Sequence, residues 1–183
     1  MKRESLGPIG AIIGCSTVIL FAIALLIKNI PQNIVSWILW TILEALILAS
    51  SLAAGNKKPW LPIAYTFGAL SVMVILFSKG LWVFGAVEFI ATVGCVFAMM
   101  LWFKLGPKWA IVAATIAMVV AGIPALFDII RTPNPQSWWM WLGCSLAGLL
   151  TAISAKSWKI EDRFMPTTSF VYNFFMFILV LVR

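Results

Sequence analysis

The feature that most constrains the fold of this chain is a succession of seven apolar runs, each about twenty residues long and separated by short polar joints. A helix of this length spans the roughly 30 Å hydrocarbon core of a bilayer. Only 10% of the residues are charged, against roughly 25% in soluble domains. The sequence therefore predicts an all-α integral membrane protein with seven transmembrane helices. The predicted spans are residues 9–27, 34–54, 60–78, 81–103, 109–130, 137–155 and 164–182.

The distribution of lysine and arginine predicts the orientation of the chain. Of the 13 Lys and Arg residues, nine lie at the N-terminus or after the second, fourth and sixth spans, and four lie on the other side. Basic residues favour the cytoplasmic side, so we expect a cytoplasmic N-terminus and an external C-terminus, as in a bacterial inner-membrane protein. The basic residues form no stripe, and the net charge of +7 does not indicate nucleic-acid binding.

Several chemistries are disfavoured by the residue types present. The chain has no histidine, and its cysteines, Cys15, Cys95 and Cys144, lie inside apolar runs without metal-ligand spacing. No paired carboxylates or nucleophile constellation of the kind used in acid–base or covalent catalysis occur in the sequence. We therefore expect no metal, no cofactor and no enzymatic activity. Gly122 and Pro124 predict a kink in the fifth span, because proline removes a backbone hydrogen bond.

A shift of 104 residues aligns rare residues of the two halves of the chain. The aligned pairs are Pro31 with Pro135, Gln32 with Gln136, Trp37 with Trp141 and Pro62 with Pro166. Three spans, one linking span and three further spans give both triplets the same direction across the membrane. The sequence thus predicts two parallel three-helix repeats, residues 1–79 and 105–183, joined by a linker helix at 80–104. The alternative is that helical hairpins in any membrane protein use proline at the bend.

A three-one-three arrangement with Pro-Gln at the end of the first helix of each triplet resembles the PQ-loop superfamily. This superfamily includes the SWEET sugar transporters, cystinosin-like exporters, PnuC vitamin transporters and the KDEL receptor. Tryptophan-rich sequence at 36–40 and 137–141 replaces the usual Ser/Gly-rich continuation, so the chain looks like an outlying bacterial branch. The resemblance implies a substrate-binding asparagine on the seventh helix, for which Asn173 is the candidate. The predicted topology is opposite to that of SWEETs and similar to that of PnuC proteins.

The Pro-Gln dipeptides are also candidate hinges. A proline at a helix end weakens the local hydrogen-bond ladder, and a neighbouring glutamine amide can satisfy a freed group. Flexing at Pro31, Gln32, Pro135 and Gln136 would suit rocking between the two triplets. A static turn is the alternative interpretation.

One face of the second span carries candidate substrate-binding residues. Trp37, Thr41 and Glu44 recur at helical spacing, and Trp141 and Ser145 repeat the pattern on the sixth span. A ring with a hydroxyl one turn deeper on each of two equivalent helices indicates a pocket between the repeats. The alternative is that small residues allow close helix packing and tryptophans lie at the membrane interface.

Three acidic residues inside the predicted spans, Glu44, Glu88 and Asp128, are candidates for proton coupling. An ionisable group at the centre of a membrane helix costs at least about 2.5–3.5 kcal/mol, so each one suggests a function. Glu44 ranks first because it shares the candidate binding face, whereas Gly148 stands at the equivalent position of the repeat. Asp128 lies one turn before Arg131, and simple pairing between them is the alternative.

These features lead us to expect a small-solute membrane transporter or facilitator with a central site between the repeats. The acids inside the spans favour a neutral, zwitterionic or cationic substrate. The alternative is a non-transporting membrane module, such as a receptor, an assembly factor or an accessory subunit, whose ten tryptophans would meet other helices. The expected partners are the lipid bilayer, a small solute, and a second copy of the chain or another membrane-complex subunit, without nucleic acid.

Overall fold

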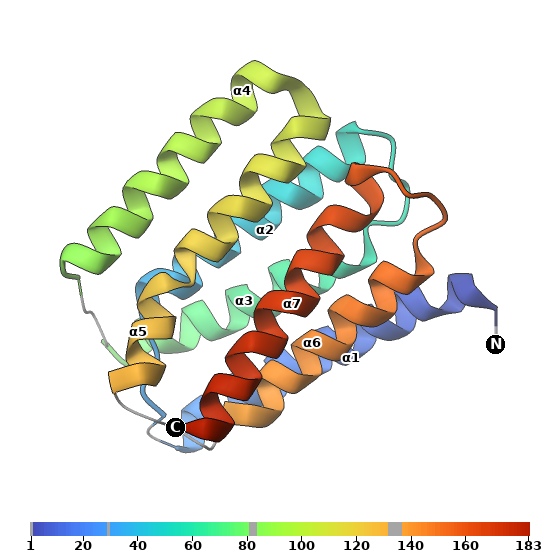
Figure 1. Cartoon of the computed structure of the whole chain (residues 1–183). Helices are drawn as coiled ribbons and strands as arrows, with labels where there is room; N and C mark the ends of the chain where they lie inside the picture. The colour runs from blue at the N-terminus through green and yellow to red at the C-terminus, as the bar shows by residue number, and fades with distance from the viewer. Residues whose placement is uncertain (1, 29, 81–83, 132–136) are drawn as a thin grey trace.

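The computed structural model describes residues 2–28, 30–80, 84–131 and 137–183, and the regular elements in these ranges are all helical (Figure 1). The helices are α1 (Leu6–Ile27), α2 (Ile34–Ala53), α3 (Trp60–Ser78), α4 (Ala86–Ala121), α5 (Ile123–Arg131), α6 (Trp138–Ser154) and α7 (Ile160–Val182), after a short 3-10 turn (Arg3–Ser5). The prediction of an all-α chain is confirmed.

The lengths of these helices are consistent with an integral membrane protein. Among the described residues, five helical segments are long and apolar enough to cross a membrane. Two further apolar helices, Ala86–Phe97 and Trp138–Ser154, are shorter. Many large apolar side chains face outward, and Phe67, Phe97 and Phe103 are each more than half exposed. Such faces suit a lipid environment better than water.

Helix α4 consists of two antiparallel arms joined by a sharp bend (Figure 1). Gly106 at the bend has φ 78°, in the left-handed region that favours glycine. The first arm (86–105) corresponds to the predicted fourth span, and the second arm (107–121) corresponds to the first part of the predicted fifth span. The Cys95 thiol of the first arm lies 3.5 Å from the carbonyl oxygen of Ala117 in the second. The first arm begins at Ala86, later than the predicted residue 81.

The predicted kink in the fifth span is confirmed. Helix α4 ends at Ala121, Gly122 is its C-cap, and Pro124 lies in the first turn of α5. Because proline fixes its own φ and lacks an N–H donor, it fits the first turn of a new helix better than the interior of a continuous one. The fifth span is therefore built from the second arm of α4 followed by α5.

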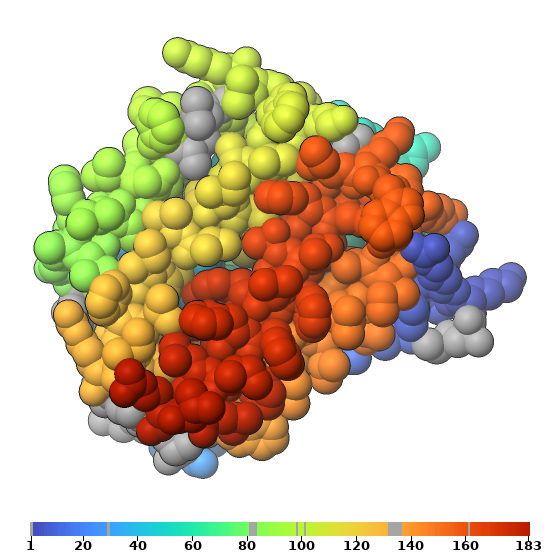
Figure 2. Space-filling view, viewed as in Figure 1, coloured from blue at the N-terminus to red at the C-terminus, as the bar shows by residue number. Residues whose placement is uncertain are grey.

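Six helical segments form a ring. Helix α1 packs against α3 and α6, α2 packs against α3 and α4, and α7 packs against α6 and α4. Trp40 Nε1 of α2 donates to the Met118 carbonyl oxygen at 3.0 Å, which places the second arm of α4 beside α2. The order around the ring is α1, α3, α2, the second arm of α4, α7 and α6. On the face seen in Figures 1 and 2, α7 fills the space between α6 and the second arm.

The chain joints fall into two groups at opposite ends of the ring. The N-terminus, the α2–α3 loop, the bend of α4 and the α6–α7 loop lie at one end, whereas α5 and the C-terminus lie at the other (Figure 1). At the first end the Arg3 guanidinium donates to the carbonyl oxygens of Ile153 and Ala155, and Glu4 pairs with Lys156 at 2.9 Å. These contacts satisfy carbonyls at the end of α6 and anchor the N-terminus there.

Candidate functional site

A cavity of about 70 Å³ lies inside the ring of helices. Its lining comes from α1, α2, α3, the second arm of α4, α6 and α7, so every segment of the ring contributes to it. Most of the lining side chains are apolar or aromatic. Among the described lining residues, Glu44 is the acidic one. The combination of a mostly apolar wall and a few convergent polar groups is typical of a small-molecule site.

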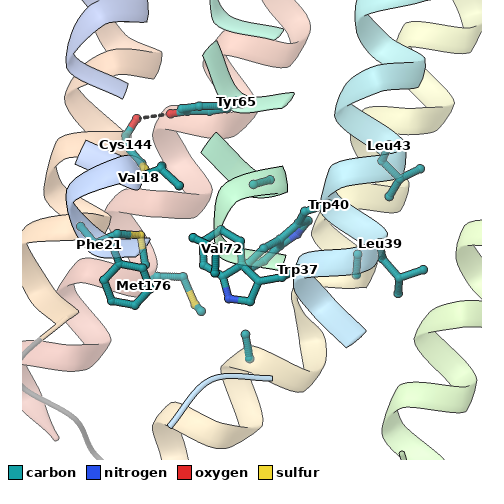
Figure 3. Close-up of a cluster of buried hydrophobic side chains, with 14 of the residues drawn as sticks. Val18, Phe21, Trp37, Leu39, Trp40, Leu43, Tyr65, Val72, Cys144 and Met176 are labelled. Carbon is teal, nitrogen blue, oxygen red and sulfur yellow. Dashed lines mark hydrogen bonds between the residues drawn. The ribbon is translucent and has the colours of Figure 1, made fainter. Parts of the chain in front are cut away.

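Helix α2 supplies the acid and two of the aromatic side chains of the cavity. Trp37, Trp40 and Glu44 all line it. Their spacing of three and four residues places them on one face of the helix. In Figure 3, Trp37 and Trp40 point from α2 to one side, whereas Leu39 and Leu43 point to the other. Trp37 and Glu44, which the sequence pattern places on one face, both belong to the cavity lining.

Three aromatic rings from three different helices meet at the cavity. The ring centroids of Trp40 and Trp141 lie 6.2 Å apart, those of Trp40 and Tyr172 6.4 Å, and those of Trp141 and Tyr172 6.3 Å. The rings stand at 73–80° to one another. Trp37 packs edge to face on Trp40 at 5.1 Å. We call the trio Trp40, Trp141 and Tyr172 the aromatic cage.

Two polar atoms of the cavity are buried without a hydrogen-bond partner in the described part of the chain. They are Glu44 Oε2, in a residue that is 2% exposed, and Trp141 Nε1. Leaving a buried polar group unpaired costs about 1–3 kcal/mol, and most such groups in folded proteins are paired. Two other unpartnered buried atoms, the hydroxyls of Ser36 and Ser50, belong to residues outside the lining. Both atoms belong to residues that line the same cavity.

A polar network crosses the cavity wall from α3 to α6 and α7. The Tyr65 hydroxyl donates to the Cys144 carbonyl oxygen at 2.7 Å, as the dashed line in Figure 3 marks. Ser169 Oγ donates to the Tyr65 oxygen at 3.3 Å, and Asn173 Nδ2 donates to the Ser169 carbonyl oxygen at 2.7 Å. Asn173 is buried and lines the cavity, where the sequence places a candidate substrate ligand.

Two predicted binding residues, Thr41 and Ser145, do not belong to the cavity lining. Thr41 Oγ1 donates to the Trp37 carbonyl oxygen at 2.7 Å, and Ser145 Oγ donates to the Phe170 carbonyl oxygen at 3.3 Å. A helix turns by about 100° per residue, so residues 40 and 44 lie on one side of residue 37 and residue 41 lies on the other. The predicted face was therefore rotated slightly away from the cavity.

The other two predicted proton-coupling acids also lie outside the lining. Glu88 accepts a 2.8 Å hydrogen bond from Asn33 Nδ2 and a second one from a backbone N–H at the start of α4. Asp128 lies close to the Asn33 amide and to the charges of Glu88 and Arg131. These acids thus form a polar group at the joint between α2, α4 and α5. Among the three candidates, Glu44 is the one that lines the cavity.

The Pro31-Gln32 dipeptide lies in the connection between α1 and α2. Pro31 comes after the end of α1, so it removes no hydrogen bond from that helix. Gln32 Nε2 donates to the Pro31 carbonyl oxygen at 2.8 Å, and Gln32 Oε1 accepts from Trp37 Nε1 at 3.1 Å. The dipeptide thus positions one aromatic residue of the cavity. Pro135 and Gln136 lie outside the described residues, and hinge motion stays a prediction.

Sequence reasoning missed three aromatic residues of the site, Trp40, Tyr65 and Tyr172. Trp40 follows Trp37 at a helical spacing of three, which could have identified it. Tyr65 and Tyr172 lie on α3 and α7, and their side chains reach the cavity through the packing of those helices in the ring. Periodicity within one helix carries no information about that packing.

Comparison with known proteins gives no match to a family model, a curated protein or a solved structure. Among the described residues, no group of three or more His, Cys, Asp or Glu side chains could hold a metal ion.

Proposed function

We propose that the protein is a small-solute membrane transporter or facilitator whose substrate binds in the central cavity. The observation that carries this proposal is Glu44, a buried residue with an unpartnered carboxyl oxygen, which lines a cavity with walls from six helical segments. A polar group of this kind inside a membrane-spanning bundle is expensive, and substrate or ion pathways are its usual role.

The cavity lies between two three-helix units in this proposal. The N-terminal unit comprises α1, α2 and α3. The C-terminal unit comprises the second arm of α4 with α5, then α6 and α7, and the first arm of α4 is the linker. Helix ends support this division, because three equivalent ends are each separated by 104 residues. These ends are Ile27 and Arg131, Ile34 and Trp138, and Ser78 and Val182.

The cavity lining supports the same division. Four pairs of lining residues are separated by the same 104 residues, namely Trp37 and Trp141, Trp40 and Cys144, Tyr65 and Ser169, and Ala69 and Asn173. Tyr65 and Ser169 also hydrogen-bond to each other at 3.3 Å. Equivalent residues meet in this way when they lie next to a twofold axis. The cavity on that axis is where rocking of two units would expose a substrate alternately to the two sides.

Helix packing between the units is reciprocal, which also supports a twofold relation. Helix α1 of the N-terminal unit packs on α6 of the C-terminal unit, and α2 packs on α4. Exchange of the two units turns one of these contacts into the other. We further propose that the end carrying the N-terminus is cytoplasmic, because nine of the 13 basic residues belong to it.

The cavity favours a neutral, zwitterionic or cationic substrate. No lysine or arginine is among its described lining residues, and Glu44 supplies a carboxylate. An anion would meet this carboxylate in a low-dielectric setting where like charges repel strongly. A neutral or positively charged group can instead pair with the Glu44 carboxyl group.

Uptake into proteoliposomes tests the proposal. We would measure accumulation of radiolabelled urea, glycine and methylammonium as neutral, zwitterionic and cationic probes. We expect saturable uptake of at least one probe, reduced at least tenfold by Glu44→Gln, which keeps the shape of the side chain and removes its charge. Glu4→Gln is the control, because Glu4 is exposed at the end of the ring and far from the lining, and it should leave uptake unchanged. Uptake equal to that of empty liposomes for all three probes would contradict the proposal.

The small volume of the cavity supports a second candidate function, a receptor that binds a small solute without moving it. About 70 Å³ is roughly half the 150 Å³ of an apolar protein cavity that holds benzene. A site that stayed this size would retain a small ligand rather than pass it through. Saturable binding by the purified protein together with no uptake into liposomes would favour this candidate.

A further inference from the structure

A second cavity, of about 80 Å³, lies at the end of the ring that carries the N-terminus (Figure 1). Its lining includes Asn56 and Lys58 of the α2–α3 loop and Asp162 in the first turn of α7. We propose that this cavity is the entrance of a solute path, and that a layer of apolar side chains around Met165 is the gate between it and the central cavity. The inference rests on the proposed function in taking the central cavity as the solute site, and it adds the route and its barrier.

The two cavities follow one another along the same helices. Helix α2 contributes Glu44 to the central cavity and Ser51, seven residues later, to the second one. At 1.5 Å per residue these positions are about 10 Å apart along the helix axis. Helices α3, α6, α7 and the second arm of α4 also supply residues to both linings. The two cavities are therefore stacked within one bundle and do not belong to different faces of it.

The lining of the second cavity combines equivalent residues of the two proposed units. Five pairs of its residues are separated by 104 residues, namely Ile47 and Thr151, Ser51 and Ala155, Lys58 and Asp162, Leu61 and Met165, and Pro62 and Pro166. The central cavity contains four pairs with the same separation. In the two-unit arrangement both cavities then lie on one twofold axis, along which a substrate would cross the membrane between two rocking units.

A layer of buried apolar side chains separates the two cavities. Met165 lines both of them and is 2% exposed, so it belongs to the wall that they share. Three further residues of the second lining are 0–1% exposed, and each is one helical turn from a residue of the central lining. These pairs are Ile47 with Glu44, Leu61 with Tyr65, and Ile111 with Thr115. We call Ile47, Leu61, Ile111 and Met165 the apolar layer.

The apolar layer is a barrier to a polar solute. Narrow apolar constrictions exclude water, and membrane pores use them as gates that close by dewetting. The entrance side of the layer carries polar side chains, among them Lys58 and Asp162, which keep that cavity hydrated. A solute that moves inward must lose its hydration at the layer, and unpaired polar groups are costly to bury there. The closed layer thus holds the central cavity shut at this end of the ring.

Met165 is the member of the layer that can open it with the least rearrangement. Methionine is unbranched and has three rotatable side-chain bonds, so it can change rotamer while the helices stay in place. Leucine and isoleucine are branched, and isoleucine is also stiff at its first side-chain bond. Along α7, Met165 lies between Asp162 of the second lining and Thr168 of the central lining, three residues from each. A swing of this one side chain would join the two cavities.

Labelling of single cysteines on the two sides of the layer tests the proposal. Cys15, Cys95 and Cys144 are replaced by alanine, and one reporter is added, either Ser154→Cys in the second lining or Thr168→Cys in the central lining. Both reporter positions are half-buried. The full-length protein in lipid nanodiscs is treated with the polar thiol reagent 2-aminoethyl methanethiosulfonate, and intact-protein mass spectrometry follows the labelled fraction. We expect Ser154→Cys to react at least tenfold faster than Thr168→Cys, and equal rates would overturn the barrier.

Variants of Met165 test the gate itself. Met165→Ala should raise the labelling rate of the Thr168→Cys reporter at least tenfold and leave the rate of Ser154→Cys unchanged. Met165→Val shortens the side chain with a smaller loss of packing, so it should give an intermediate rate and carries the test if Met165→Ala does not fold. Helical circular dichroism and elution from gel filtration check the fold of each variant. An unchanged Thr168→Cys rate in the folded Met165 variants would overturn the gate.

Met140→Ala is the matched control for these variants. Met140 is 1% exposed and belongs to the lining of the central cavity but not to that of the second one. Its truncation enlarges the central cavity without shortening the apolar layer, so the Thr168→Cys reporter should keep its slow rate. Equal acceleration by Met140→Ala and Met165→Ala would reflect general loosening of the bundle and would overturn the assignment of Met165.

Failure of this inference and failure of the proposed function give different results, because labelling does not require transport. Faster labelling of Thr168→Cys in Met165→Ala, with no uptake of any probe by liposomes, would support the gate and contradict transport. Glu44-dependent uptake by liposomes, with labelling that Met165→Ala leaves unchanged, would support transport and overturn the gate.

Discussion

In the proposed two-unit arrangement, the N-terminal unit carries Glu44 at the position where the C-terminal unit carries Gly148. A Cβ atom added to Gly148 would lie 2.7 Å from the Phe170 nitrogen and 2.9 Å from the Pro166 carbonyl oxygen. Helices α6 and α7 thus pack backbone against backbone, as small residues allow in membrane bundles. Helix α2 instead holds a carboxyl group that lines the cavity. One unit uses this position for close packing, and the other uses it for polar chemistry.

A second difference is an exchange of large and small residues between the units. In the N-terminal unit Val18 of α1 faces Gly68 of α3, where an added Cβ would lie 2.9 Å from Val18 Cβ. In the C-terminal unit the glycine is Gly122, beside the Tyr172 ring of α7. The same packing problem is solved with opposite residues. The C-terminal solution alone brings a ring from its third helix into the aromatic cage.

The largest expected effects come from exchanging this second pair. A Cβ at residue 122 would lie 1.9 Å from the Tyr172 hydroxyl, so Gly122→Val should destabilise the fold by about 3 kcal/mol through overpacking. Tyr172→Gly should cost about 3–5 kcal/mol through loss of a buried ring. The double variant recreates the Val18–Gly68 pair. Its loss of unfolding free energy should be about 1–3 kcal/mol smaller than the sum of the losses of the two single variants. Unfolding by sodium dodecyl sulfate in mixed micelles measures each free energy.

A strictly additive double variant would contradict the equivalence of the two contacts. Helical circular dichroism of each variant before titration checks that the comparison concerns the folded protein.

An intermediate effect is expected for Gly148→Ala. The new methyl group would meet backbone atoms of α7 at 2.7–3.1 Å, and backbone cannot move aside cheaply, so a loss of about 1–3 kcal/mol should follow. Gly94→Ala is the matched control, because its nearest neighbour is a methyl group of Val120 at 3.0 Å that can rotate. The same micelle titration should show a smaller loss for the control. Equal losses would mean that the α6–α7 contact is looser than the structure indicates.

The smallest expected effect has the opposite sign and concerns Glu44. Glu44→Leu replaces an unpartnered buried carboxyl by an apolar group of similar size, so the unfolding free energy should rise by about 1–2 kcal/mol. Glu4→Leu, at an exposed residue, is the control and should leave the unfolding free energy unchanged. A destabilised but folded Glu44→Leu protein would show that the carboxyl has a structural partner.

The sequence by itself determined the helices and several of their interruptions. Hydropathy located apolar segments of membrane-spanning length, because burial in lipid demands the same apolar character along the whole segment. Gly122 and Pro124 located the break between α4 and α5, because proline acts on its own backbone. Glu44 could be identified as a site candidate for a similar reason, since an acid inside an apolar run conflicts with its immediate surroundings.

The tertiary structure alone decided which side chains meet. Glu88 finds its partner in Asn33, 55 residues away, and Thr41 turns out of the lining although it lies next to Trp40. Tyr65 and Tyr172 reach the cavity only through the packing of α3 and α7 in the ring. Periodicity within a helix reports a face to within a broad angle, whereas the position of a cavity depends on how neighbouring helices pack. That packing is set by contacts between residues far apart in the chain, which no single segment encodes.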